Sequence, residues 1–155
     1  MNLDKIDRDL LRHLQADGRL PNAELAQRVG LSASACFRRL QRLEQDRVIS
    51  GYHATLDGDA IGKPTTVFIE VTLSSQGSAA LDAFERAVAA CDDVLECHLM
   101  SGDFDYLLRV AVPDMPALER FILEQLSPIA QVEKIRSSFA LKQVRYKTAL
   151  PLGSA

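Results

Sequence analysis

Residues 22–44, NAELAQRVGLSASACFRRLQRLE, constrain the fold most, because they place two helix patterns only three residues apart. Leu25 and Val29 lie four apart, as one face of a short helix requires. Gly30 favours the left-handed conformation that ends a helix, and Ser32 is a good N-cap for the next one. A helix of about two turns followed by so short a turn predicts a helix-turn-helix.

A further helix pattern precedes this pair in residues 4–18, DKIDRDLLRHLQADG. Asp4 can cap its start, and Gly18 ends it. The apolar residues on one face are Ile6, Leu10, Leu11 and Leu14. Residues 48–52 fit a short wing or linker strand that leads out of the module formed by residues 1–50.

The helix expected after Ser32 has a short, polar and basic outer face. Cys36, Leu40 and Leu43 form its buried stripe. Guanidinium groups suit phosphates and guanine edges, and small residues at the helix start permit close approach to the major groove. A bland alternative is a solvated helix whose arginines pair with Glu44 and Asp46, but the preceding turn favours DNA. The predicted DNA-binding residues are Ser32, Ala33, Ser34, Arg38, Arg39 and Arg42.

The charge is divided unevenly along the chain. The formal net charge is −3, yet residues 1–50 hold nine Lys/Arg against seven Asp/Glu. Residues 51–155 hold nine against fourteen. This asymmetry indicates a basic module followed by an acidic one, so the negative total does not exclude nucleic acid.

Other compositional signals are mostly negative. No apolar run approaches the roughly 18 residues of a membrane span, and the N-terminus is unlike a signal peptide, so we expect a cytoplasmic protein. The cysteines are odd in number and lack Cys-x-x-Cys spacing, which argues against disulfides and a zinc ribbon. We therefore expect no metal and interpret Cys36, Cys91 and Cys97 as small buried residues.

Residues 64–155 show the order strand, helix, strand, strand, helix, strand. Residues 65–73, TTVFIEVTL, alternate apolar and other residues as a strand with one buried face does. This order predicts a ferredoxin-like βαββαβ domain of the α+β class, in which both helices cover one sheet face. Residues 51–63 would be a linker strand between the two domains.

The second sheet face would have no cover within the chain. Alternation gives it a half-apolar character that suits packing against a symmetry mate, so we expect a homodimer at minimum. Its expected residues are Phe68, Glu70, His98, Met100, Asp105, Leu107 and Arg109.

Residues 101–110, SGDFDYLLRV, can be interpreted in two ways. In the structural interpretation Gly102 makes a hairpin turn, Asp103 caps it, and Phe104, Tyr106 and Leu108 fill the core face of the strand. Asp105 would then lie on the uncovered face, where a lone carboxylate is costly unless a cation meets it. The segment therefore also predicts a ligand site.

The chain strongly resembles the Lrp/AsnC, or feast/famine, family of transcriptional regulators. The resemblance rests on LDKIDRDLLRHLQADGR, ELAQRVGLS, CFRRLQRLE, VISGYHA and ECHLMSGDFDYLLRVAVPDM in the family's order. It implies an N-terminal winged helix-turn-helix that binds double-stranded DNA and a C-terminal domain that dimerises, assembles further, to an octamer, and binds amino acids. Pro21 stands where the family commonly has Ser or Thr, and SASACFRR differs from the usual string, so the recognised base sequence does not carry over.

The same resemblance locates an amino-acid effector site at the loop around Gly102, at a contact between dimers. Asp103 or Asp105 would receive the ammonium group, and backbone N–H groups near Gly102 the carboxylate. We expect an aliphatic or aromatic amino acid and no other cofactor. The expected effector-binding residues are Met100, Gly102, Asp103, Asp105, Tyr106, Met115, Ser137 and Ser138.

Two other function classes compete with an effector-responsive regulator. An enzyme is disfavoured because the chain has no G-x-S-x-G, Gly-rich phosphate loop or metal set, and its three histidines lie in unrelated segments. An architectural DNA-binding protein without ligand sensing is the alternative, and the intact SGDFDY segment argues against it.

Overall fold

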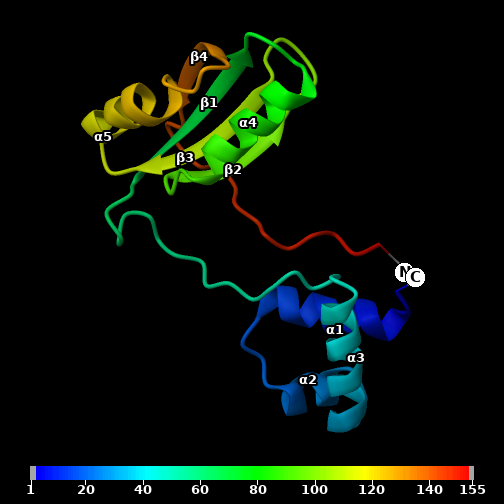
Figure 1. The fold of residues 1–155 in the computed structure, drawn as a ribbon. Helices are drawn as coiled ribbons and strands as arrows, with labels where there is room; N and C mark the ends of the chain where they lie inside the picture. Colours follow the sequence, from blue (N-terminus) through cyan, green and yellow to red (C-terminus); the bar gives the residue numbers. More distant parts are fainter. Residues whose placement is uncertain (1–2, 154–155) are drawn as a thin grey trace. The chain divides into compact units, whose positions relative to one another are not determined.

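A computed structural model describes residues 3–153, which divide into two compact units (Figure 1). Within this range, one comprises residues 3–55 together with residues 145–153, and the other comprises residues 56–144. Among the described residues no helix is long and apolar enough to cross a membrane.

The first unit contains the three helices that the sequence predicts, α1 (Lys5–Ala16), α2 (Asn22–Arg28) and α3 (Ala33–Gln45). Asp4 caps α1 through the Asp7 N–H, as expected. Gly30 has φ +68° and ends α2, and the Leu31 N–H bonds the Ala26 carbonyl at 2.9 Å in the turn. The helix-turn-helix is therefore confirmed. Its core consists of Leu10, Leu20, Leu25, Ala26 and Cys36.

The expected strand over residues 48–63 is not formed in the described chain. Residues 50–57 are irregular, and residues 58–62 form turns. Lys63 N–H bonds the Gly58 carbonyl at 2.8 Å in these turns. A strand needs a neighbour to pair its backbone groups, and here the chain supplies none. The wing and the linker strand were thus wrong for the single chain.

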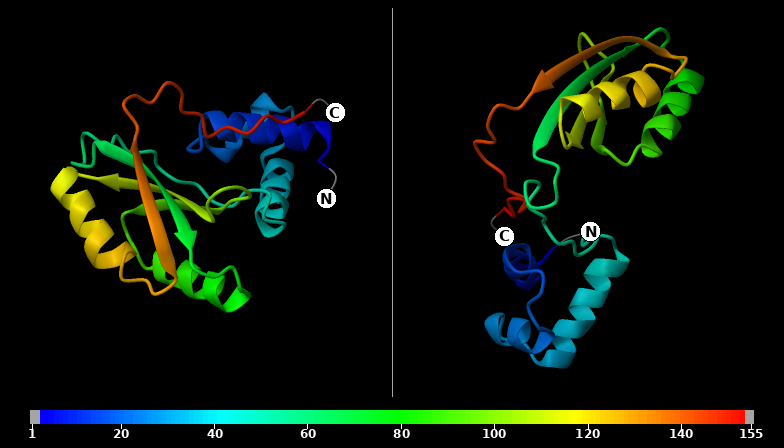
Figure 2. Two further views of the ribbon diagram at one scale, coloured as in Figure 1. Left: turned by 90° about the horizontal axis from the view of Figure 1, so that it is seen from above. Right: turned by 90° about the vertical axis from the view of Figure 1, so that its left-hand side faces the viewer.

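The C-terminal segment returns to the helical unit. Gln15 of α1 donates its side-chain amide to the Leu150 carbonyl at 3.1 Å and accepts the Leu150 N–H at 2.6 Å. Figure 2 shows this segment, in red, running beside α1. The helical unit is therefore built from both ends of the sequence.

The second unit is an antiparallel four-stranded sheet with order β2-β3-β1-β4. In chain order its elements are β1 (Thr65–Leu73), α4 (Ser78–Ala89), β2 (Val94–Leu99), β3 (Tyr106–Val112), α5 (Met115–Arg120) continuing as a π-helical turn η1 (Phe121–Leu126), and β4 (Val132–Phe139). This is the predicted βαββαβ order, with the first and third strands central. Both helical segments cover the same sheet face (Figures 1 and 2).

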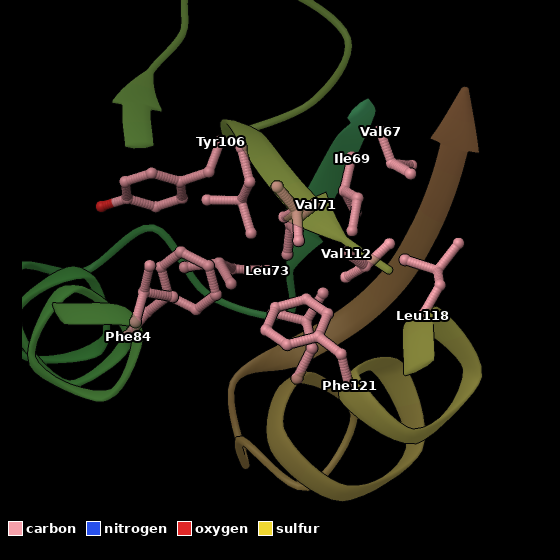
Figure 3. Packing of buried hydrophobic residues seen from close by; sticks show 13 residues of the cluster. Val67, Ile69, Val71, Leu73, Phe84, Tyr106, Val112, Leu118 and Phe121 are labelled. Atoms are coloured by element: carbon pink, nitrogen blue, oxygen red, sulfur yellow. The ribbon is translucent and has the colours of Figure 1, made fainter. Parts of the chain in front are cut away.

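The core of this unit lies between that sheet face and the helices (Figure 3). Val67, Ile69 and Val71 of β1 are completely buried, as their alternation predicts. Phe84 of α4 packs on Tyr106 of β3, with ring centroids 4.5 Å apart. Apolar side chains at every second strand position thus fix the register against the helices.

The edge strand β2 differs from expectation. Alternation along residues 94–100, VLECHLM, predicts a strand with Leu95, Cys97 and Leu99 pointing inward, yet all three are exposed. Cys97 and Leu99 pair with the buried Leu108 and Tyr106, so they lie on the helix side of the sheet. Because β2 forms the sheet edge, the helices cover it only in part. Of the three cysteines only Cys36 is buried, so the prediction was wrong for Cys97 and Cys91 is half-buried.

The uncovered sheet face carries both apolar and charged side chains, as predicted. Phe68 and Leu107 lie there, beside two ion pairs. Arg109 lies 2.7 Å from Glu96, and Arg136 lies 3.5 Å from Glu70. The charged side chains are therefore already paired with each other across neighbouring strands.

Candidate functional site

The start of α3 presents an exposed, polar surface. The Ser32 hydroxyl caps the helix by accepting the Ala35 N–H at 3.2 Å, and it lies 3.2 Å from the Ser34 hydroxyl. Asn22 of α2 donates to the Ala33 carbonyl at 2.9 Å, which ties the starts of both helices together. Ser32, Ala33 and Ser34 are all exposed. The first turn of α3 is thus held firmly yet open to a large ligand.

Two of the three arginines assigned to DNA are engaged by α1. The Asp7 carboxylate is buried, and it accepts hydrogen bonds from the guanidinium groups of Arg39, at 2.8 Å, and Arg42, at 2.6 Å. Arg39 also donates to Asp4 at 2.7 Å. These ion pairs join α1 to α3, so Arg39 and Arg42 have a structural role that sequence reasoning did not assign.

Arg38 is different from its neighbours. It is exposed, and no carboxylate of residues 3–153 lies within ion-pairing distance of it. Of the basic side chains predicted to contact DNA, Arg38 is therefore the one whose charge is uncompensated. Phe37 beside it is also exposed, a feature that helical periodicity alone did not single out.

The loop between β2 and β3 contains the predicted effector residues Gly102 and Asp103. Gly102 has φ +146°, a conformation that residues with a Cβ rarely adopt. Asp103 is exposed, and so is Met100 at the end of β2. Met100 N–H bonds the Asp105 carbonyl at 2.8 Å and so closes the loop.

Asp105 does not lie on the open sheet face, so its predicted placement was wrong. Its side chain is buried, and both carboxylate oxygens are used. One accepts the Leu73 N–H at 2.7 Å and the other accepts the Gln76 side-chain amide at 2.7 Å. The carboxylate thus bonds the Leu73 N–H where β1 ends, in place of a strand carbonyl. These two hydrogen bonds offset the desolvation cost of burying the Asp105 carboxylate, so no cation is needed.

Tyr106 belongs to the core. Its ring packs on Phe84 (Figure 3). Its hydroxyl donates to Glu85 at 2.8 Å. Burial, followed by the Glu85 carboxylate, raises the pKa of the Tyr106 hydroxyl, which therefore stays protonated as a donor. Among the described residues, no group of three His, Cys, Asp or Glu side chains is arranged to hold a metal ion.

The remaining predicted effector residues lie elsewhere. Met115 and Ser137 line a groove of about 480 Å³ between α5 and β4. The register puts Gly102 at the sheet end where β3 begins, whereas Met115 follows the opposite end of β3. Ser138 pairs with Phe68 on the uncovered face. A single chain therefore separates these eight residues into at least two groups.

Comparison with known proteins assigns each of the two units to a known domain family. Residues 3–44 match the AsnC-type helix-turn-helix domain, and residues 66–150 match the Lrp/AsnC ligand binding domain. The chain is 40% identical over 149 residues to the leucine-responsive regulatory protein of Escherichia coli (strain K12), covering 96% of this chain and 91% of that protein.

Two solved structures are similar over almost the whole chain. A transcriptional regulator from Neisseria meningitidis in complex with L-methionine is 37% identical, with a TM-score of 0.91 and 97% of each chain covered. A feast or famine regulatory protein from M. tuberculosis complexed with L-methionine is 34% identical, with a TM-score of 0.83, covering 95% of this chain and 97% of that one. The helix-turn-helix, the ferredoxin-like sheet and these matches together establish that the chain belongs to the Lrp/AsnC family of transcriptional regulators, with a DNA-binding and a ligand-binding domain.

Proposed function

We propose that this regulator reads double-stranded DNA through the exposed start of α3 and that a free amino acid adjusts this binding. The observation that carries the DNA part is the uncompensated charge of Arg38, which lies on the exposed face of α3 one turn after Ser34. Arg38 binds a guanine edge in the major groove, and Ser32, Ala33 and Ser34 permit the approach. Arg42 pairs with Asp7 but is half exposed, and its free edge contacts a DNA phosphate. Arg39 contributes indirectly, because its ion pair with Asp7 fixes α3 against α1.

The effector is an apolar amino acid, and L-methionine is the first candidate. Relatives that are 37% and 34% identical were crystallised with L-methionine. Asp103 is the exposed carboxylate of the β2–β3 loop and binds the ammonium group, while N–H groups beside Gly102 bind the carboxylate. Asp105 supports this loop from below, since its oxygens are bonded to Leu73 and Gln76.

The site is completed by a second copy of the chain. One chain keeps Met115 and Ser137 away from the β2–β3 loop, so they join the pocket only if they come from a neighbouring protomer. Phe68 and Leu107 on the uncovered sheet face supply apolar contacts for a homodimer, and further association gives an octamer. Ligand bound at a shared site shifts the assembly equilibrium, and DNA affinity changes with it.

Binding-site selection from a random duplex library, followed by footprinting, tests the DNA part. We expect two half-sites about 34–36 Å apart, as two copies of α3 on one DNA face require. Light scattering of the same preparation should give at least a dimer at micromolar concentration. A monomer in solution, or selected sequences with no shared half-site, would contradict the proposal.

A further inference from the structure

Phe37 is a large apolar side chain that the fold of the helical unit does not use. Its side chain is 51% exposed, and the core around Leu10, Leu25 and Cys36 does not include it. Single exposed apolar residues are common on protein surfaces, so exposure alone carries no conclusion. The inference rests instead on the position of the Phe37 ring on α3.

Phe37 borders the surface of α3 that faces away from the core. Residues three and four apart share a helix face, which puts Phe37 beside Ala33, Ser34 and Gln41. Arg38 is the next residue, and all of these side chains are exposed. The ring therefore lies among the groups that enter the major groove if the start of α3 reads DNA.

The other edge of this surface is occupied. Asp7 holds Arg39 and Arg42, both of which lie on the α1 side of α3. The side chains of α3 left to read base edges are thus few, and Phe37 is the large apolar one among them. A ring at this place cannot hydrogen-bond, so it can recognise only an apolar group on a base.

The major groove offers one such group, the C5 methyl of thymine. We propose that Phe37 is a specificity-determining residue that packs against a thymine methyl next to the base pair contacted by Arg38. This inference rests on the DNA-reading face proposed above. It assigns to an aromatic residue a part of sequence recognition that the basic residues cannot supply.

Deoxyuridine substitution tests this contact, because it removes only the thymine methyl. The duplex obtained by binding-site selection with the full-length chain is prepared with each thymine in turn replaced by deoxyuridine. Fluorescence anisotropy then gives Kd at fixed salt for wild type and for Phe37→Ala. At one thymine of a half-site, wild type should lose about fourfold in affinity, the factor for one methyl-sized group.

Phe37→Ala should bind the thymine duplex more weakly and be insensitive to the same replacement. Gln41→Ala is the matched control, since it should weaken binding yet keep the methyl discrimination. Phe37→Leu should keep part of the discrimination between thymine and deoxyuridine. If Phe37→Ala does not fold, the contact is tested with Phe37→Leu instead.

The inference is overturned if Phe37→Ala and Phe37→Leu discriminate thymine from deoxyuridine as wild type does, or if wild type discriminates at no position. Arg38→Ala separates this failure from that of the DNA-reading face. Unchanged DNA affinity in Arg38→Ala would show that the face itself is wrong. Reduced affinity in Arg38→Ala with no effect at Phe37 would reject only the methyl contact.

Discussion

Arg42 of α3 donates to the buried carboxylate of Asp7 in α1 across 2.6 Å. An arginine on the helix proposed to read DNA thus also fixes the orientation of that helix. Arg39 shares the same carboxylate at 2.8 Å, so one buried charge is balanced by two partly exposed ones. The helical unit therefore couples its stability to the side chains proposed to face DNA.

Replacing Asp7 with Asn should destabilise the helical unit by about 2 kcal/mol. Removing one member of a buried ion pair costs roughly 3–5 kcal/mol, and the partial exposure of both arginines reduces this loss. Asp9→Asn is the matched control, because Asp9 pairs with Arg12 on the surface and its loss should cost less than about 1 kcal/mol. Urea unfolding followed by far-ultraviolet circular dichroism measures both. Equal losses would show that the Asp7 pairs contribute no more than a surface pair.

Acid should weaken the same region. Hydrogen bonds from the Asp7 N–H, and then from Arg39, hold the pKa of Asp4 below its ordinary value of 3.8. Since the folded-state pKa is the lower one, the stabilisation is present above the unfolded value and is lost as pH falls through the folded value. The melting temperature of the helical unit should therefore fall with pH below about 4, and less steeply in Asp4→Asn. Parallel curves for wild type and variant would contradict this.

Arg38→Ala and Arg39→Ala should separate recognition from stability. Arg38 has no ion pair within the described chain, so its loss should leave the melting temperature unchanged and cost about 1–3 kcal/mol of discrimination against a wrong base. Arg39→Ala should lower the melting temperature, because it leaves Asp4 and Asp7 with fewer partners. Anisotropy on selected and scrambled duplexes, with parallel melts, checks both. The reverse pattern would mean that the two roles are exchanged.

Two aspartates at the β2–β3 loop, Asp103 and Asp105, should likewise separate ligand binding from stability. Asp105→Ala should destabilise the sheet unit by about 1–3 kcal/mol, because it leaves the Leu73 N–H and the Gln76 amide without their partner. Asp103→Ala should leave stability unchanged and weaken amino-acid binding, as the exposed carboxylate is the proposed ammonium partner. Thermal melts and calorimetry with L-methionine measure the two effects. Full ligand affinity in Asp103→Ala would remove Asp103 from the site.

Periodicity predicted most of the fold, and it failed where a partner decides the structure. The α1, α3 and β1 patterns identify their buried faces because local spacing sets which side chains point inward. Strand alternation put Leu95, Cys97 and Leu99 inside, but exposure at a sheet edge depends on how far the helices reach. The linker strand was wrong for a related reason, since pairing needs a second strand.

The candidate site was predictable only in part. The residue types of Gly102 and Asp103 predicted a hairpin turn, and the structure puts both in the β2–β3 loop. Their effector role follows from the family resemblance and stays a prediction. The bonds of Asp105 to Leu73 and Gln76 join residues about thirty positions apart, which spacing does not reveal. The same applies to Asp7 and Arg42. An N3 aspartate in a capping box predicts a local role, and its long-range partners appear only once α1 packs on α3.

The affinity of the full-length protein for its selected DNA, with and without L-methionine, tests the central claim most directly. If the assembled protein couples DNA reading by α3 to an amino acid bound at the β2–β3 loop, saturating L-methionine should change Kd by about 5- to 150-fold, or 1–3 kcal/mol. Asp103→Ala should bind the same DNA and lose this response. If neither L-methionine nor any other of the twenty amino acids changed Kd, the ligand-sensing account would be contradicted, and a DNA-binding protein without effector control would take its place.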